Sequence, residues 1–216
     1  MKDFVVIGLG RFGSSVAANL HRFNKNVLGI DPDEDALSAA LPNLTRGVVA
    51  DAADERTLKE LNVRSYDAAI VGIGSDLGTS ILVTEMLKEL GVPLVIARAT
   101  SDHHAKCLLK VGADRVIAPE RDMGIRVARN IAEANLLDFI DLDPEVSIQE
   151  VSILDEMVGR SLRDLDLAGR YGANVIAIKR NEAVTINPRP DEVLRAGDII
   201  IVIGRNGRFA QLVKRQ

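Results

Sequence analysis

The feature that most constrains the fold is an alternation of short apolar runs, rich in β-branched residues, with longer amphipathic stretches of helical spacing. Runs that are apolar on both faces and are separated by helices are typical of a parallel sheet covered on both sides. The first part of the chain is therefore predicted to be α/β, with a doubly wound parallel sheet of Rossmann type. The six runs are 4–8, 26–31, 47–50, 68–73, 94–97 and 115–118.

A glycine-rich loop follows the first run directly and opens the first amphipathic stretch. In such a loop Gly8 makes the tight turn, Gly10 lets the backbone approach a diphosphate, and Gly13 allows close packing of helix on strand. The exposed amides at the helix start receive the phosphates. The alternative is a tight turn without a ligand. The expected loop residues are Gly8, Leu9, Gly10, Arg11, Phe12 and Gly13.

Asp31 stands at the end of the second run, at the spacing from the glycine loop that dinucleotide-binding folds use. Its carboxylate is placed to accept hydrogen bonds from both ribose hydroxyls and would repel a 2′-phosphate. The alternative is that Asp31 caps a helix that begins near Pro32. The combination of loop and aspartate predicts an adenine nucleotide with an unphosphorylated ribose.

Three further strand ends fall on the same predicted sheet edge, where ligands of this fold bind. Asp51 and Ala52 end the third run and are expected to flank the adenine, although an ordinary strand-to-helix turn explains them almost as well. The same alternative applies to the end of the fourth run, which is expected near the phosphates. That segment is Ile73, Gly74 and Ser75, and Arg98 after the fifth run belongs to the same expected set.

Arg11 is the unusual residue of the glycine loop. Helix amides suffice to hold a diphosphate, so an added arginine brings a forked set of donors toward the phosphate end. This favours a ligand that carries extra terminal charge. The alternative is a solvated arginine on the first helical turn.

The hydrophobic pattern changes in the later part of the chain and predicts two further segments. A long apolar helical pattern runs from Met123 through Ala134 to Leu137, and predicts a crossover helix over 121–140 after a nucleotide-binding domain over 1–120. Residues 141–216 predict a small α+β lobe. Its expected strands are 146–153, 175–178, 183–186 and 199–203.

Composition and charge exclude several classes of function. The formal net charge is −4 and Lys and Arg are spread along the chain, so no basic face is available for a nucleic acid. Apolar runs such as 199–203 are much shorter than the roughly 20 residues that a membrane-spanning helix needs. No signal-peptide pattern precedes the first run, which predicts a cytoplasmic protein.

The residues that a hydride-transferring enzyme needs are not evident. The histidines His21, His103 and His104 all fall on polar, helix-like stretches, and the adjacent pair is expected to lie on a solvated face. Neither metal-ligand spacing nor a nucleophile motif is present, and the second lobe is small for a substrate domain. The sequence therefore predicts a protein that is not an enzyme.

Three stretches complete a resemblance to the RCK, or KTN plus TrkA-C, family, and in particular to the soluble gating subunits of Ktr and Trk potassium uptake systems. The first runs from Gly112 to Gly124, the second from Tyr171 to Ile178, and the third from Leu194 to Asp198. Together with the glycine loop and Asp31, they extend the resemblance over essentially the whole chain.

The resemblance implies a homo-oligomer in which the crossover helix dimerises and the subunits form a ring, commonly an octamer. That ring would dock beneath a membrane-embedded potassium-translocating subunit at the inner face of the cell membrane. ATP or ADP, and in some members NAD or NADH, would bias the shape of the ring and so control the pore.

Roles of individual residues follow from the same resemblance. Arg11 would contact the terminal phosphate across a subunit boundary, and Glu120 would lie near the phosphates, where a divalent cation can bind. The alternative for Glu120 is a plain carboxylate at a helix start after Pro119. In the second lobe Asn174, Val175 and Ile176 resemble the cyclic di-AMP site of some relatives. Ala168 stands where relatives that bind this ligand can carry an arginine, which puts cyclic di-AMP binding in doubt.

Two other classes of function stay open beside the gating subunit. An oxidoreductase linked to NAD would turn over NADH with a small substrate. A nucleotide-binding scaffold would have no channel partner.

Overall fold

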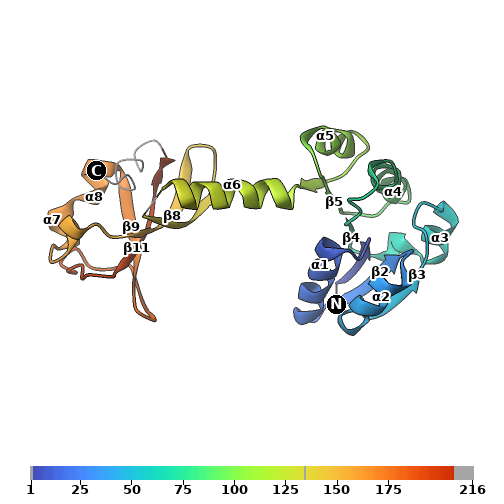
Figure 1. Cartoon of the computed structure of the whole chain (residues 1–216), viewed down its shortest axis with the longest axis horizontal. Coiled ribbons are helices and arrows are strands. Elements are labelled where there is room, and N and C mark those ends of the chain that lie inside the picture. The colour runs from blue at the N-terminus through green and yellow to red at the C-terminus, as the bar shows by residue number, and fades with distance from the viewer. Residues whose placement is uncertain (1, 134, 207–216) are drawn as a thin grey trace. The chain divides into compact units, whose positions relative to one another are not determined.

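The chain divides into two compact units, and the boundary along the chain falls between Arg121 and Asp122 (Figure 1). A computed structural model describes residues 2–133 and 135–206. The predicted second lobe extends to residue 216, so its last ten residues lie outside the described part of the chain.

The first unit is built on a six-stranded parallel sheet with the strand order β3-β2-β1-β4-β5-β6. This order is that of the doubly wound Rossmann sheet, and the predicted fold class is confirmed. The order reverses between β1 and β4, so a crevice opens there at the carboxyl ends of the strands. The strands are β1 (Asp3–Ile7), β2 (Asn26–Asp31), β3 (Arg46–Val49), β4 (Ala68–Val71), β5 (Val95–Arg98) and β6 (Arg115–Ile117).

Helices cover the two faces of this sheet and bury two separate apolar cores. On one face, Ala17, Leu37 and Ala40 pack against Val6 and Ile70 of the sheet. On the other face, Leu58, Val83, Leu87 and Leu108 belong to a larger core with the β1, β4 and β5 side chains. The helices are α1 (Arg11–Arg22), α2 (Glu34–Ala40), α3 (Glu55–Glu60), α4 (Leu77–Glu89) and α5 (Asp102–Lys110), with short 3-10 turns η1 (Leu41–Asn43) and η2 (Val63–Ser65).

Helix α6 (Pro119–Ala132) follows β6, and none of its described residues is buried within the chain. Its large apolar side chains are exposed, among them Met123, Ile125 and Ile131. An amphipathic helix without a covered apolar face is typical of a contact with another chain.

The helix ends earlier than the apolar pattern predicted. Residues Leu136–Asp141 form strand β7 rather than the end of a helix over 121–140, and Ala134 lies outside the described residues. Leu136 is 2% exposed in the core of the second unit, and β7 pairs antiparallel with β8. A short apolar segment fits either periodicity, and here pairing with a neighbouring strand decided the outcome.

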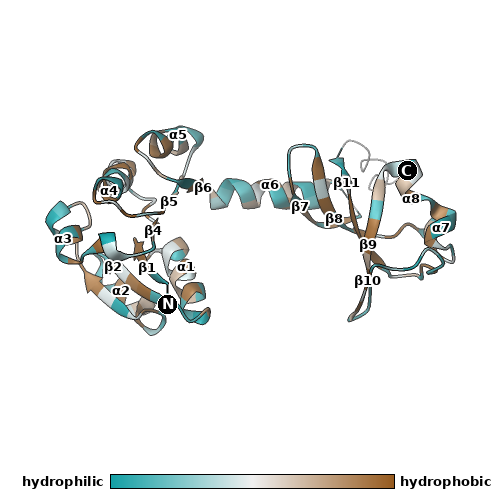
Figure 2. Cartoon of the chain, turned by 180° about the vertical axis from the view of Figure 1, so that it is seen from behind, coloured by the Kyte–Doolittle hydropathy of each residue, from teal (hydrophilic) through white to brown (hydrophobic). Residues whose placement is uncertain are grey.

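The second unit contains a five-stranded antiparallel sheet with the strand order β10-β9-β11-β8-β7. Hydrophobic residues recur along β8 and β9 (Figure 2). The core of this unit includes the buried side chains of Ile178, Leu194 and Ile200. Short helices cover this core. The remaining elements are β8 (Val146–Ser152), η3 (Asp155–Met157), α7 (Leu162–Leu165), α8 (Leu167–Tyr171), β9 (Ala173–Arg180), β10 (Ala183–Ile186) and β11 (Ile199–Arg205).

A buried ion pair ties the end of β9 to the turn that precedes β11. Arg180 Nε and Nη2 donate to the two carboxylate oxygens of Asp198, each at 2.8 Å, and the Arg195 N–H donates to the same carboxylate at 2.8 Å. The Asp198 side chain is fully buried. Hydrogen bonds from Arg180 hold the pKa of Asp198 below its usual range, although burial acts in the opposite direction.

Candidate functional site

A cavity of about 620 Å³ opens at the carboxyl edge of the parallel sheet, at the reversal between β1 and β4. Its volume is within the range of small-molecule and cofactor sites. The ends of five neighbouring strands contribute to its lining. The sequence-predicted residues that line it are Gly8, Gly10, Asp31, Asp51, Ala52, Ile73, Gly74, Ser75 and Arg98.

The glycine loop is shaped by two close approaches of backbone to backbone. Gly8 has φ +85°, and a Cβ at this residue would lie 3.0 Å from the Ile73 backbone nitrogen. A Cβ at Gly13 would lie 1.9 Å from the Gly8 carbonyl oxygen, so α1 can start here only with glycine at residue 13. Gly10 is the N-cap of α1, and a Cβ there would meet nothing within 4 Å. The start of α1 is therefore open to a ligand, as anion binding at a helix N-terminus requires.

Asp31 holds the loop as well as facing the cavity. Its Oδ2 accepts from the Leu9 N–H at 2.5 Å and its Oδ1 accepts from the Asp33 N–H at 2.9 Å, while the residue is only 8% exposed. The N-cap of α2 is Asp33, which accepts from the N–H groups of Asp35 and Ala36, so the alternative in which Asp31 caps this helix is wrong. A carboxylate offers about four acceptor sites, so Asp31 retains two for a ligand.

Arg98 is the only cationic side chain among the described residues that line the cavity. Its Nη2 donates to Glu120 Oε1 in an ion pair. The two partners differ in burial, because the Arg98 side chain is 20% exposed and that of Glu120 is 66% exposed. Hydrogen bonds from its own backbone N–H and from Arg98 lower the pKa of Glu120, and the nearby charge of Arg11 acts in the same direction.

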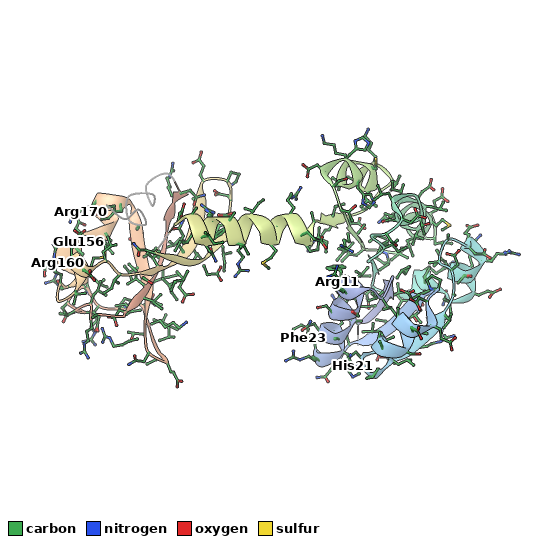
Figure 3. All side chains as sticks on the ribbon, viewed as in Figure 1. Arg11, His21, Phe23, Glu156, Arg160 and Arg170 are labelled. Atoms are coloured by element: carbon green, nitrogen blue, oxygen red, sulfur yellow. The ribbon has the colours of Figure 1, made fainter. Side chains whose placement is uncertain are left out.

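The other predicted site residues lie beside the cavity rather than in its lining. Arg11 is the first residue of α1 (Figure 3), and with Leu9 it lines an adjoining hollow. Phe12 packs against the core beneath α1. The positions compared with a cyclic di-AMP site are on β9, with Ala168 in α8, which contacts β9.

Three polar residues that were not predicted as site residues also line the cavity. Asp33 follows β2, and Asp76 and Thr79 lie at the start of α4. Asp76 accepts from the Thr79 N–H at 3.2 Å and from its hydroxyl at 2.8 Å. The available signal was their position in the turns that follow predicted strands, which places them on the same edge of the sheet.

The histidines lie elsewhere. None of the described residues that line the cavity is a histidine. The expectation that His103 and His104 share a solvated face is wrong for His104, which is 2% exposed. Its Nδ1 accepts from the Thr100 N–H at 3.3 Å, and burial lowers its pKa. The helix turns adjacent side chains by about 100°, so neighbours in the sequence face different surroundings.

The described residues contain neither a cluster of metal ligands nor a membrane-spanning helix. Within residues 2–133 and 135–206, no three acidic, histidine or cysteine side chains are grouped closely enough to hold a metal ion. None of the helices in these same residues has the length and apolar character needed to cross a membrane.

Two protein families match the two units. Residues 4–119 match the TrkA-N domain and residues 148–216 match the TrkA-C domain. The Ktr system potassium uptake protein C of Bacillus subtilis (strain 168) is 42% identical over 214 residues, which are 99% of this chain and 97% of the relative. The Ktr system potassium uptake protein A of the same organism is 38% identical, over 94% of this chain and 91% of the relative.

Solved structures of the GsuK channel are also similar. The channel bound to NAD superposes with a TM-score of 0.55 at 23% identity, over 99% of this chain and 38% of the channel chain. The structure bound to ADP has a TM-score of 0.53 at 27% identity, over 62% of this chain and 34% of the other. This chain thus spans well under half of the channel chain.

Proposed function

The chain belongs to the family that joins a TrkA-N domain to a TrkA-C domain, and from this premise we propose that it is a nucleotide-sensing regulatory subunit of a potassium uptake system. An adenine nucleotide would occupy the cavity of the first unit. Its binding would change the conformation of the assembled protein and so control potassium flux through a membrane-embedded partner.

The observation that carries the proposal is the cavity itself, in a chain whose relatives with 38–42% identity are potassium uptake proteins over almost their full length. In this cavity the amides at the start of α1 would receive phosphate and Asp31 would accept from the ribose hydroxyls. Arg11, Arg98 and Glu120 would act at the phosphate end. The ADP-bound GsuK structure supports an adenine nucleotide for this fold.

Several finer parts of the proposal depend on the family resemblance. The ligand would be ATP or ADP, with NAD or NADH as the alternative, and a divalent cation would bind near Glu120. The exposed apolar side chains of α6 would pair two copies of the chain. By the family resemblance, these pairs would assemble into larger rings, commonly octamers, that dock on the inner face of the membrane. Cyclic di-AMP at β9 is the candidate ligand of the second unit, and the alanine at residue 168 argues against it.

Each domain expected from the sequence has its own role in the proposed function. Residues 1–120 would bind nucleotide, 121–140 would connect and dimerise, and 141–216 would complete the oligomer. Enzymatic turnover is not part of the proposal, because the relatives are potassium uptake proteins.

A thermal-shift panel of ATP, ADP, NAD, NADH and cyclic di-AMP tests ligand binding directly. A ligand that binds only the folded protein at one hundred times its Kd adds about 2.7 kcal/mol of stability. We expect ATP and ADP to raise the melting temperature. If none of the four adenine nucleotides raises it, the proposal is wrong.

Regulation is tested by potassium flux into vesicles that contain the membrane subunit of a Ktr system. We expect the flux to depend on this chain and on the nucleotide present. A flux that is the same with and without the chain would support the scaffold without a channel partner. Consumption of NADH with a small substrate would instead support the oxidoreductase.

A further inference from the structure

The Arg98–Glu120 ion pair engages the cationic side chain that lines the cavity. Four carboxylates line the cavity, and Arg98 is the only lysine or arginine among its described lining residues. The four carboxylates are those of Asp31, Asp33, Asp51 and Asp76. A phosphate that enters this cavity therefore has one lining side chain to pair with, in addition to the backbone amides.

The position of the Arg98 guanidinium is set by the backbone after β4. A Cβ at Gly74 would lie 2.4 Å from Arg98 Nη1, so the guanidinium packs directly on this glycine. Gly74 belongs to the segment after β4 that is expected near the phosphates of a ligand. Arg98 Nε is buried and has no hydrogen-bond partner in the described part of the chain, so the guanidinium retains unused donors.

Glu120, whose carboxylate pairs with Arg98, is the more exposed partner of the pair. Glu120 keeps two thirds of its side-chain surface exposed, whereas Arg98 keeps one fifth. Moving an exposed glutamate back into water costs little, because exposed ion pairs contribute only a small net free energy. A ligand phosphate offers the same guanidinium an anion of higher charge and matching geometry.

We infer that the Glu120 carboxylate binds the Arg98 guanidinium at the position that a nucleotide phosphate would take. Nucleotide binding therefore replaces the carboxylate with the phosphate on the same guanidinium. The inference rests on the proposed function, because the competing phosphate belongs to a nucleotide in that cavity. Glu120 is the second residue of α6. The exchange therefore releases the first turn of α6 from the end of β5. Nucleotide binding in the cavity thus changes the contacts at the start of this helix.

Calorimetric titration of the full chain with ATP and with ADP, in EDTA, tests this exchange. EDTA removes divalent cations, which would give Glu120 a second and favourable role in binding. We expect Glu120→Gln to bind at least one of the two nucleotides about twofold to fivefold more tightly than the wild type, the range for loss of a competing exposed ion pair.

A matched control separates competition from a general change of charge. Glu55→Gln removes the same charge from the same unit, where Glu55 pairs with Lys59 at 2.9 Å in α3 and does not line the cavity. We expect its nucleotide affinities to equal those of the wild type. In an Arg98→Ala background, Glu120→Gln should give no gain, since the guanidinium for which the anions compete is absent.

The possible results lead to different conclusions. Unchanged or weaker binding by Glu120→Gln, or an equal gain in the Arg98→Ala background, would overturn the exchange while leaving the proposed function intact. Absence of any ATP or ADP binding by the wild type would overturn both. A gain that requires Arg98 supports the exchange.

Discussion

The two units use the same chemical pair, an arginine with a carboxylate, under opposite conditions of burial. In the first unit the carboxylate of Glu120 is 66% exposed and shares Arg98 with the cavity. In the second unit the carboxylate of Asp198 is 0% exposed and is held by Arg180 and by a backbone N–H. The exposed carboxylate can leave its partner at low cost, whereas the buried one cannot.

This difference indicates what each pair does. The Arg180–Asp198 pair fixes the turn that precedes β11 against the end of β9, and it gains nothing from being reversible. The Arg98–Glu120 pair is at the rim of a cavity, where an exchangeable partner is useful to a sensor. Burial of the carboxylate, rather than the identity of the residues, separates a structural pair from a binding one.

Of the variants that test this difference between the two pairs, Arg180→Met should have the largest effect, and that effect is on folding stability. It leaves Asp198 buried without a counter-charge, which costs about 3–5 kcal/mol of folding free energy. Arg98→Met should cost no more than about 1 kcal/mol, because Glu120 remains hydrated. Urea unfolding of the full chain, with hydrogen exchange to locate the loss in β9 and β11, measures both. Equal losses in the two variants would contradict the distinction.

Asp31→Ala should have the next largest effect, on ligand affinity. Loss of a charged acceptor for the ribose hydroxyls should weaken every adenine nucleotide by about 1.5–3 kcal/mol. The variant also frees the Leu9 and Asp33 N–H groups, so the glycine loop should loosen. Calorimetry with ATP and ADP measures the affinity.

Asp33→Ala is the control for Asp31→Ala. It removes the N-cap of α2 and should lower stability by about 0.5–2 kcal/mol. Its nucleotide affinity should change much less than that of Asp31→Ala. If Asp31→Ala binds as tightly as the wild type, the role of Asp31 is confined to holding the loop.

Arg11→Ala should affect only one of the two nucleotides. Arg11 is expected to pair with a terminal phosphate that ADP lacks, so ATP should weaken by about 1.5–3 kcal/mol while ADP changes little. ATP-dependent activation of potassium flux should be lost. Lysine at this position should rescue binding only in part, because a point charge lacks the forked geometry.

Arg22→Ala, at the other end of α1, is the control for Arg11→Ala because it removes the same charge from the same helix. We expect it to bind both nucleotides normally. If Arg11→Ala weakens ATP and ADP equally, Arg11 is a shared diphosphate clamp and the discriminating contact is elsewhere.

The smallest expected effect is a change in the acid stability of the second unit. Arg180 lowers the pKa of Asp198, so the stability from this pair is present above the unfolded pKa of about 3.9 and is lost as pH falls through the folded pKa. In Arg180→Met, burial without a partner should raise that pKa, and acid should then partly restore stability. Urea midpoints between pH 3 and 7 test this, and parallel curves for the two proteins would refute it.

Much of the first unit could be predicted from the sequence. The central strands β2 and β4 are buried on both faces, and the helices that cover the sheet send apolar side chains into its two cores, so the local patterns identify these elements without knowledge of their neighbours. The glycine loop and Asp31 could be found because their residue types and spacing are fixed by the turn they make.

The segment 136–141 shows where this kind of prediction fails. Its apolar residues fit a helix and a strand alike, and pairing with β8 selected the strand. His104 shows the same limit on a smaller scale, because burial depends on the packing of α5 rather than on the polar residues that precede it.

The sequence alone determined the parallel fold, the glycine loop and the family resemblance, since each depends on residues close together along the chain or on fixed motif spacing. Only the tertiary structure decided which charges meet. Arg98 and Glu120 are 22 residues apart and Arg180 and Asp198 are 18 apart, and no local pattern pairs them. Strand order and side-chain burial bring each pair together and determine whether its carboxylate is free to leave.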